Sequence, residues 1–185
     1  MYYKYMMHSY EDIRKRYKPT RIRLLFIAES PPPDAQTQSS RHFYRSDKIR
    51  RDDRLFVNTI KALYPEAANQ TEATIEPQKE AWLQRFKADG YYMIEALEES
   101  QIHEVTKQQR QQKIVAALPR LLERVEQIVP KGTAIVLIKS NVFIVAAEPL
   151  RKAGYKVLNT ELLDYPGRFN QKAYREKLQK LVKDQ

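Results

Sequence analysis

The chain of 185 residues contains no cysteine. This absence excludes disulfides, zinc sites built on cysteine, cysteine-ligated iron–sulfur clusters and thiol catalysis, and it fits a reducing compartment. Only three histidines are present, and they lie far apart in the sequence, which argues against a metal site built on them. No apolar run is long enough to cross a bilayer, and the first ten residues lack the apolar stretch of a secretory signal. We therefore expect a cytoplasmic protein with no metal, no cofactor and no membrane partner.

Glycine is also scarce, with four residues in the whole chain. The segment after the first predicted strand reads Glu29-Ser-Pro-Pro-Pro-Asp34 and holds none of them. Glycine-rich turns bind phosphate through close backbone amides, and proline has no amide hydrogen to donate. The dinucleotide-binding and phosphate-loop motifs are absent, as are the nucleophile elbow of serine hydrolases and the zinc-binding HExxH motif. These absences exclude the commonest nucleotide-binding and hydrolase classes.

Basic residues are what the chain has in excess, because 33 Lys and Arg face 23 Asp and Glu for a formal charge of +10. Residues 1–54 carry 13 basic and 7 acidic residues, and residues 151–185 carry 9 and 4. The middle of the chain is nearly neutral, so both basic segments are terminal. A basic surface attracts phosphate backbones, although a net charge of this kind also serves solubility. Charge alone leaves nucleic-acid binding and plain solubility equally open; the partner expected from the whole sequence is nucleic acid, with DNA favoured over RNA.

The apolar pattern predicts an α/β fold in one domain that spans residues 1–185. Four short apolar segments read as buried strands, at 23–28, 91–96, 133–138 and 155–159. Helical spacing fills the gaps, in segments that begin at Asp52 or Asp53, at 77–86, 105–129, 141–153 and 169–182, with a kink or restart expected at Pro119. Gly90, Gly132 and Gly154 each precede a strand, where a left-handed helix end is expected. Alternation of this kind predicts a three-layer α/β/α sandwich with a four-stranded, mostly parallel sheet.

Two unusual loops follow predicted strands, and ligands of such sheets bind beyond the carboxyl ends of the strands. The first loop, after residue 28, combines carboxylates with a rigid proline turn, two aromatic residues and several arginines. The second loop surrounds Pro166 and offers an aromatic, an arginine and an amide. Aromatic rings can stack on bases while arginines hold phosphates, but the same residues also serve as core or as a solvated charge run. The candidate site residues are Glu29, Asp34, Arg41, Phe43, Tyr44, Arg45, Tyr165, Arg168 and Asn170.

The order of strands and the two loops resemble the uracil-DNA glycosylase superfamily. Its first motif is a strand that leads into Gly-acid-x-Pro-Gly, to which Ala28-Glu29-Ser30-Pro31-Pro32 is similar. Its second motif is His-Pro-Ser or Asn-Pro-Ser at the far edge of the sheet, where this chain has Tyr165-Pro166-Gly167. The chain departs from the family where Ala28 and Pro32 replace glycines and Tyr165 replaces the His or Asn.

The resemblance implies hydrolysis of the N-glycosidic bond of a damaged or deaminated base that is flipped from the stack. Glu29 would then be the catalytic carboxylate with Asp34 in reserve, and Phe43 or Tyr44 would stack on the base. The nucleic-acid strand would be contacted by Arg41, Arg45, Tyr165, Arg168 and Asn170. Two alternatives stay open, a non-catalytic nucleic-acid binder on the same fold and an α/β domain with a different small-molecule or protein partner.

Overall fold

The four predicted strands form one parallel sheet in the computed structural model, which describes residues 10–32, 42–46, 53–100 and 106–183. The strands are β1 (Leu24–Ala28), β2 (Tyr91–Glu95), β3 (Ala134–Leu137) and β4 (Lys156–Val157), in the order β2-β1-β3-β4. Leu24 of β1 pairs with Tyr91 on one side and with Ala134 on the other. All five residues of β1 are buried, as expected for a strand that helices cover on both faces.

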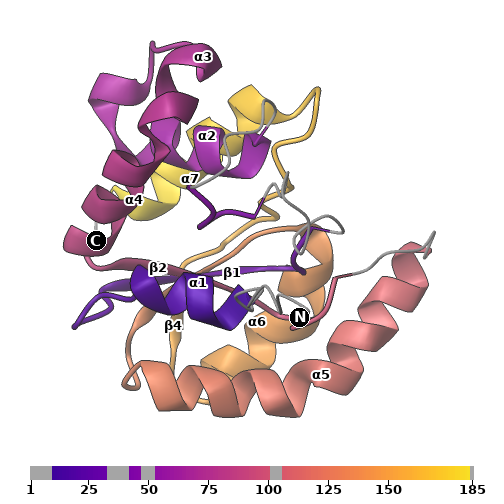
Figure 1. Cartoon of the computed structure of the whole chain (residues 1–185). Helices are drawn as coiled ribbons and strands as arrows, with labels where there is room; N and C mark the ends of the chain where they lie inside the picture. Colours follow the sequence, from indigo (N-terminus) through magenta and orange to yellow (C-terminus); the bar gives the residue numbers. More distant parts are fainter. Residues whose placement is uncertain (1–9, 33–41, 47–52, 101–105, 184–185) are drawn as a thin grey trace, which may run out of the picture.

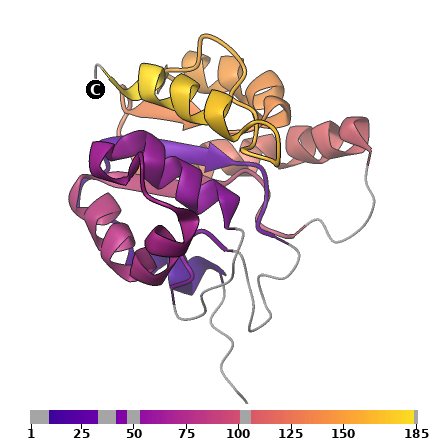
Figure 2. The ribbon, with the colours of Figure 1, turned by 90° about the horizontal axis from the view of Figure 1, so that it is seen from above.

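Helices lie on both faces of this sheet and give three layers (Figure 1). One face carries α2 (Arg54–Leu63), α3 (Glu72–Ile75), α4 (Lys79–Ala88) and α7 (Gln171–Val182), and the other carries α5 (Lys107–Ile128) and α6 (Ser140–Lys152). Two short 3-10 turns, Pro65–Ala67 and Glu76–Gln78, flank α3. Figure 2 shows α1 (Tyr10–Arg16) on the side of β2, where Arg14 contacts Glu95. The α/β/α sandwich with a four-stranded parallel sheet is thus confirmed.

The helix boundaries follow local signals for the most part. Asp53 caps α2 by accepting a hydrogen bond from the backbone N–H of Phe56, as expected. Gly90 precedes β2 with a φ of 77°, and a Cβ there would lie 2.9 Å from Cγ of Arg23, so only glycine fits. The restart considered at Pro119 is wrong, because α5 is one unbroken helix of 22 residues that contains this proline.

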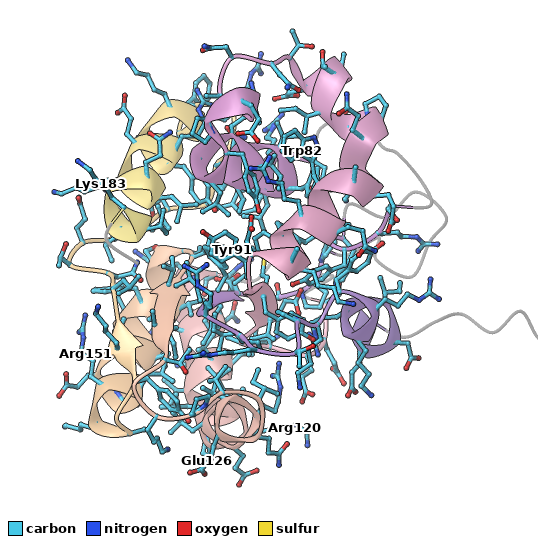
Figure 3. All side chains as sticks on the ribbon, turned by 90° about the vertical axis from the view of Figure 1, so that its left-hand side faces the viewer. Trp82, Tyr91, Arg120, Glu126, Arg151 and Lys183 are labelled. Carbon is cyan, nitrogen blue, oxygen red and sulfur yellow. The ribbon has the colours of Figure 1, made fainter. Side chains whose placement is uncertain are left out.

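The face under α4 is held by an aromatic cluster. Phe26 of β1 packs on Phe86 with ring centroids 5.7 Å apart, and Phe43 packs on Phe86 at 5.4 Å. Figure 3 shows Trp82 in the same helical layer, where its ring lies 5.4 Å from Tyr64. This packing fixes β1 rigidly, and β1 ends directly at the candidate site.

The parallel strands bring their carboxyl ends to one edge of the sheet. β1 lies between β2 and β3, so the chain first passes from β1 to the neighbouring strand β2 and later crosses back to form β3 on the other side of β1. Such a switch point leaves a crevice between the loops of the two central strands, which is where ligands of open α/β sheets bind. Glu29 follows β1, and Lys139 follows β3 by two residues.

Candidate active site at the carboxyl edge of the sheet

Glu29 lies at this switch point with its side chain almost wholly buried. The Nζ of Lys139 is 2.6 Å from its Oε1, and the Nη1 of Arg110 is 3.0 Å from the same oxygen. The other oxygen, Oε2, accepts a hydrogen bond of 3.0 Å from the Nδ2 of Asn141. The backbone is fixed as well, because the carbonyl of Glu29 accepts from the N–H of Leu97 at 2.9 Å. The carboxylate therefore has one defined position at the end of the central strand.

The surroundings of Glu29 favour the ionised carboxylate. Burial raises its pKa, but the hydrogen bond and charge of Lys139, with the hydrogen bonds from Asn141 and Arg110, lower it further than burial raises it. The resulting pKa lies below the ordinary value of 4.5. At neutral pH the site therefore holds one negative charge between two cations, and it is positive overall.

Lys139 reaches Glu29 from an unusual backbone conformation. Its φ of 84° is the only positive φ outside glycine in the described residues, and it places the residue immediately before α6. Its backbone N–H donates a 2.7 Å hydrogen bond to the carbonyl of Leu163, in the loop around Pro166. A non-glycine residue in this region is strained, and such strain is concentrated at functional sites. Lys139 thus links the loops that follow β1, β3 and β4.

Asn141 offers a buried acceptor beside Glu29. Its Nδ2 donates to Glu29, whereas its Oδ1 has no hydrogen-bond partner in the described part of the chain. The residue is only 3% exposed. A buried polar atom without a partner costs free energy unless a ligand supplies one. Because Oδ1 and Nδ2 share one amide group, this acceptor lies next to the carboxylate and can receive an N–H.

The loop around Pro166 presents its polar and aromatic side chains to solvent. Tyr165, Arg168 and Asn170 are exposed, and Asn170 also precedes α7. Phe169 is 91% exposed, with the Arg168 guanidinium 5.8 Å from its ring centroid. The bond from Lys139 to Leu163 places the start of this loop against the Glu29 cluster. Glu29, at the start of the first predicted loop, and the loop around Pro166 therefore lie at the same edge of the sheet.

The stacking role predicted for Phe43 and Tyr44 is wrong. Phe43 is 4% exposed and Tyr44 is fully buried, so neither ring is accessible to a base. The Tyr44 hydroxyl accepts a 2.6 Å hydrogen bond from the backbone N–H of Met93, on the outer side of edge strand β2. Burial raises the pKa of Tyr44 well above its ordinary value. Both rings belong to the hydrophobic core of the protein. Arg45, the next residue, is half-buried.

Two predicted residues, Asp34 and Arg41, lie outside the described residues. Three residues that complete the Glu29 cluster, Arg110, Lys139 and Asn141, were not predicted. For two of them a signal was present, because Lys139-Ser-Asn141 follows the clearest apolar strand just as Glu29 follows the first. Arg110 gave none, since it lies in the polar first turns of a long helix.

A metal-binding cluster of side chains and a helix able to span a membrane are both absent among the residues that the structure describes. Among those residues, no cluster of three His, Asp or Glu side chains could hold a metal ion. The helices described also lack the combination of length and apolar composition that a membrane-spanning segment needs. No protein-family model matches the chain, and no curated protein matches it either.

Proposed function

We propose that the protein acts on nucleic acid and hydrolyses the N-glycosidic bond of a damaged or deaminated base, with Glu29 as the catalytic carboxylate. The observation that carries the proposal is the buried, ionised Glu29 at the switch point of the sheet, fixed by Lys139, Arg110 and Asn141. Ion pairs of this kind also occur for structural reasons alone, but this one stands where ligands of the fold bind.

The chemistry follows from the charge that each fragment develops. As the bond from C1′ to the base breaks, its electron pair leaves with the base and the sugar acquires oxocarbenium character. The ionised Glu29 stabilises that positive charge and accepts a hydrogen bond from the water that adds to C1′. The proton released by this water balances the charge on the departing base. The lowered pKa of Glu29 suits this role, because the carboxylate stays charged throughout.

Recognition of the base is assigned to Asn141 and Lys139. The open Oδ1 of Asn141 accepts the ring N–H that uracil and hypoxanthine carry, and the Nζ of Lys139 can donate to a carbonyl oxygen of the base. Unmodified adenine and cytosine have no N–H at the equivalent ring position. The pair would therefore favour deaminated bases over these parents.

The nucleic-acid strand is bound by positively charged side chains and by the exposed ring of Phe169. The Glu29 cluster is positive overall, so its carboxylate does not repel a phosphate backbone. Arg168 supplies a further cation on the loop around Pro166. Phe169 takes over the stacking role assigned earlier to the buried aromatic pair, since its ring is almost fully exposed.

A second candidate function is nucleic-acid binding without catalysis. It is favoured by the engagement of Glu29 with protein groups, because its two oxygens already accept three hydrogen bonds from side chains. A carboxylate used in this way serves to position Lys139 and Arg110 as phosphate ligands. In that case no base is released.

The two functions are separated by Glu29→Gln in a base-release assay. Oligonucleotides that carry uracil or hypoxanthine are incubated with the protein, and abasic sites are then cleaved with alkali. Under the catalytic proposal the wild type forms abasic sites and Glu29→Gln loses this activity by about 10²-fold or more while it still binds. Glu148→Gln, an exposed change of the same charge on α6, is the control that retains activity. A wild type that binds every substrate and releases no base leaves only the second candidate.

A further inference from the structure

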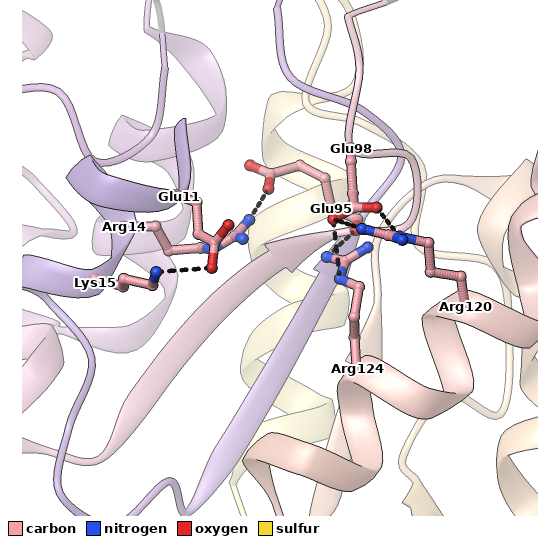
Figure 4. Close-up of polar contacts among 7 residues, drawn as sticks. All are labelled: Glu11, Arg14, Lys15, Glu95, Glu98, Arg120 and Arg124. Atoms are coloured by element: carbon pink, nitrogen blue, oxygen red, sulfur yellow. Dashed lines mark hydrogen bonds and ion pairs between the residues drawn. The ribbon is translucent and has the colours of Figure 1, made fainter. Parts of the chain in front are cut away.

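A second charged cluster lies between α1 and α5, beside the edge strand β2. It surrounds a cavity of about 260 Å³, which we name the α1–α5 cavity. Five basic residues line it, Arg14, Lys15, Lys18, Arg120 and Arg124, and two acidic ones, Glu11 and Glu98. Figure 4 shows three of these guanidinium groups converging at the carboxyl end of β2. The lining therefore has more cations than carboxylates, also when Glu95, which is ion-paired with Arg14, is counted with it.

Two of the arginines are largely buried. The side chains of Arg14 and Arg124 are only 12% and 16% exposed. The Nη1 of Arg14 lies 2.7 Å from Oε2 of Glu95, and the Nη2 of Arg124 donates to the backbone carbonyl of the same residue at 2.9 Å. Burial lowers the pKa of Arg124, and although Glu98 raises it, the charge of Arg14 lowers it again. The positive charges of this cluster are therefore offset by the carboxylates of Glu95 and Glu98, of which only Glu98 is exposed to solvent.

Glu98 occupies the position that such an anion would take. Its carboxylate makes a close ion pair with the Nε of Arg120 and lies 3.8 Å from the Nε of Arg124. It is 40% exposed, and Arg120 is 71% exposed, so solvent reaches the pair. A backbone phosphate likewise offers two oxygens and one negative charge to a guanidinium group, and it can accept hydrogen bonds from more than one arginine. It can therefore displace this carboxylate.

The size of the cavity and its neighbour define the ligand further. Its volume is below the ~300–1,000 Å³ that is usual for sites of whole small molecules, so a single phosphate group fits better than a free nucleotide. A second cavity of about 430 Å³ shares Glu98, Arg120 and Arg124 with it. Ala96, Leu97, Ala116 and Ala117 give this neighbour a more apolar wall. A nucleic-acid strand repeats a charged phosphate next to a less polar base, and a positive cavity beside a more apolar one matches this pattern.

The helix α5 connects the cavity to the candidate active site. Arg110 near its start contacts Glu29, and Arg124, 14 residues later on the same helix, lines the cavity and donates to the carbonyl of Glu95. Glu95 pairs in the sheet with Ala28, the residue before Glu29, so the cavity begins beside the candidate active site. We propose that the α1–α5 cavity binds a backbone phosphate group of the nucleic acid close to the base that enters at Glu29. This inference rests on the proposed function.

The first test compares two arginines with similar surroundings. Arg124→Gln removes a guanidinium on α5 that donates to the backbone carbonyl of Glu95. Arg151→Gln removes a guanidinium on α6 that donates to the backbone carbonyl of Asn159. Arg120 and Arg151 lie on opposite sides of the lower layer in Figure 3. For a 20-nucleotide DNA, Arg124→Gln should weaken binding about tenfold and reduce the log–log salt slope by about one, with a much smaller effect of Arg151→Gln. Equal effects of both variants would overturn the site.

The second test has the opposite sign and does not depend on the folding of Arg124→Gln. Removal of the competing carboxylate by Glu98→Gln should tighten DNA binding about threefold to tenfold, beyond the effect of Glu148→Gln, which makes the same change of charge on α6. Oligonucleotides with and without a 5′-phosphate distinguish a terminal phosphate from a backbone one. If the wild type binds DNA and Glu98→Gln matches Glu148→Gln, this site is refuted while the proposed function stands. If the wild type binds no DNA, both fall.

Discussion

The charge of Glu29 makes a specific prediction about stability and pH. Its pKa in the folded protein lies below 4.5, so its contribution to stability is present above that pH and disappears as the pH falls through the folded value. Glu29→Gln should cost about 1–3 kcal/mol at pH 7, less than a fully buried pair, because Lys139 and Arg110 are each 31% exposed. The difference from wild type should shrink below about pH 4.5. Urea unfolding at pH 7 and at about pH 3.5 measures it, and a constant difference would contradict the ion pairs.

Tyr44 gives a second prediction at the same scale. Tyr44→Phe leaves the backbone N–H of Met93 buried without its acceptor and should cost about 1–3 kcal/mol of unfolding free energy. Tyr155→Phe is the matched control, because its hydroxyl has only a 3.4 Å contact with Lys131, and it should cost less than about 0.5 kcal/mol. DNA affinity should not change in either variant. Weaker DNA binding by Tyr44→Phe at unchanged stability would show that nucleic acid reaches the ring.

The junction between β3 and α6 is the element on which the site depends, and its backbone strain can be measured. Lys139→Gly removes the cost of the positive φ, about 1–3 kcal/mol, together with the ion pair, whereas Lys139→Ala removes only the ion pair. The glycine variant should therefore be more stable than the alanine variant by about 1 kcal/mol or more. Against a Glu29→Gln background, Lys139→Gly should raise the thermal midpoint. Calorimetry of the wild type, the two Lys139 variants, Glu29→Gln and the double variant Glu29→Gln/Lys139→Gly gives the comparison. Equal stability of Lys139→Gly and Lys139→Ala would exclude backbone strain.

The elements were predictable where one physical signal dominates. Short apolar segments located all four strands, although β4 is not buried as expected, since Lys156 is exposed and Val157 half-buried. Helical spacing located α2, α4, α5, α6 and α7. Helix α1 was missed because its seven residues include Ile13 but are otherwise mostly charged, so no apolar face stands out. Pro119 suggested a break, yet the packing of α5 against α6 compensates for one lost hydrogen bond.

The site was predictable only in part, for a similar reason. The position of Glu29 after a buried strand is a local pattern, whereas its contact with Arg110 joins residues 81 apart in the chain. The aromatic pair after the first loop carried no mark in the sequence to distinguish a core residue from a stacking one. Their place in the core depends on packing between distant segments, which buries both Phe43 and Tyr44.

The whole molecule makes a prediction through its distribution of charge. The net charge of +10 is concentrated in the two terminal segments, and Arg168 of the second segment is exposed on the loop around Pro166. DNA affinity should fall steeply with salt, and Arg168→Gln should reduce the log–log slope by about one for duplex DNA. Lys131→Gln, which precedes β3 at the opposite edge of the sheet, should leave the slope nearly unchanged. Fluorescence anisotropy across a salt series measures both, and a flat response of the wild type would exclude nucleic acid as the partner.

The position of Trp82 determines what light can report about this protein. It is the only tryptophan in the chain, and it is buried on α4 against Tyr64, in the layer on the opposite face of the sheet from α5 and α6. Its emission spectrum should therefore follow the loss of that layer on unfolding and stay unchanged when a ligand enters beside Glu29. The chain also has 12 tyrosines, and Tyr165 is exposed on the loop around Pro166. Excitation that includes tyrosine, compared with excitation of tryptophan alone, thus separates occupancy of the site from integrity of the fold in a single unlabelled sample.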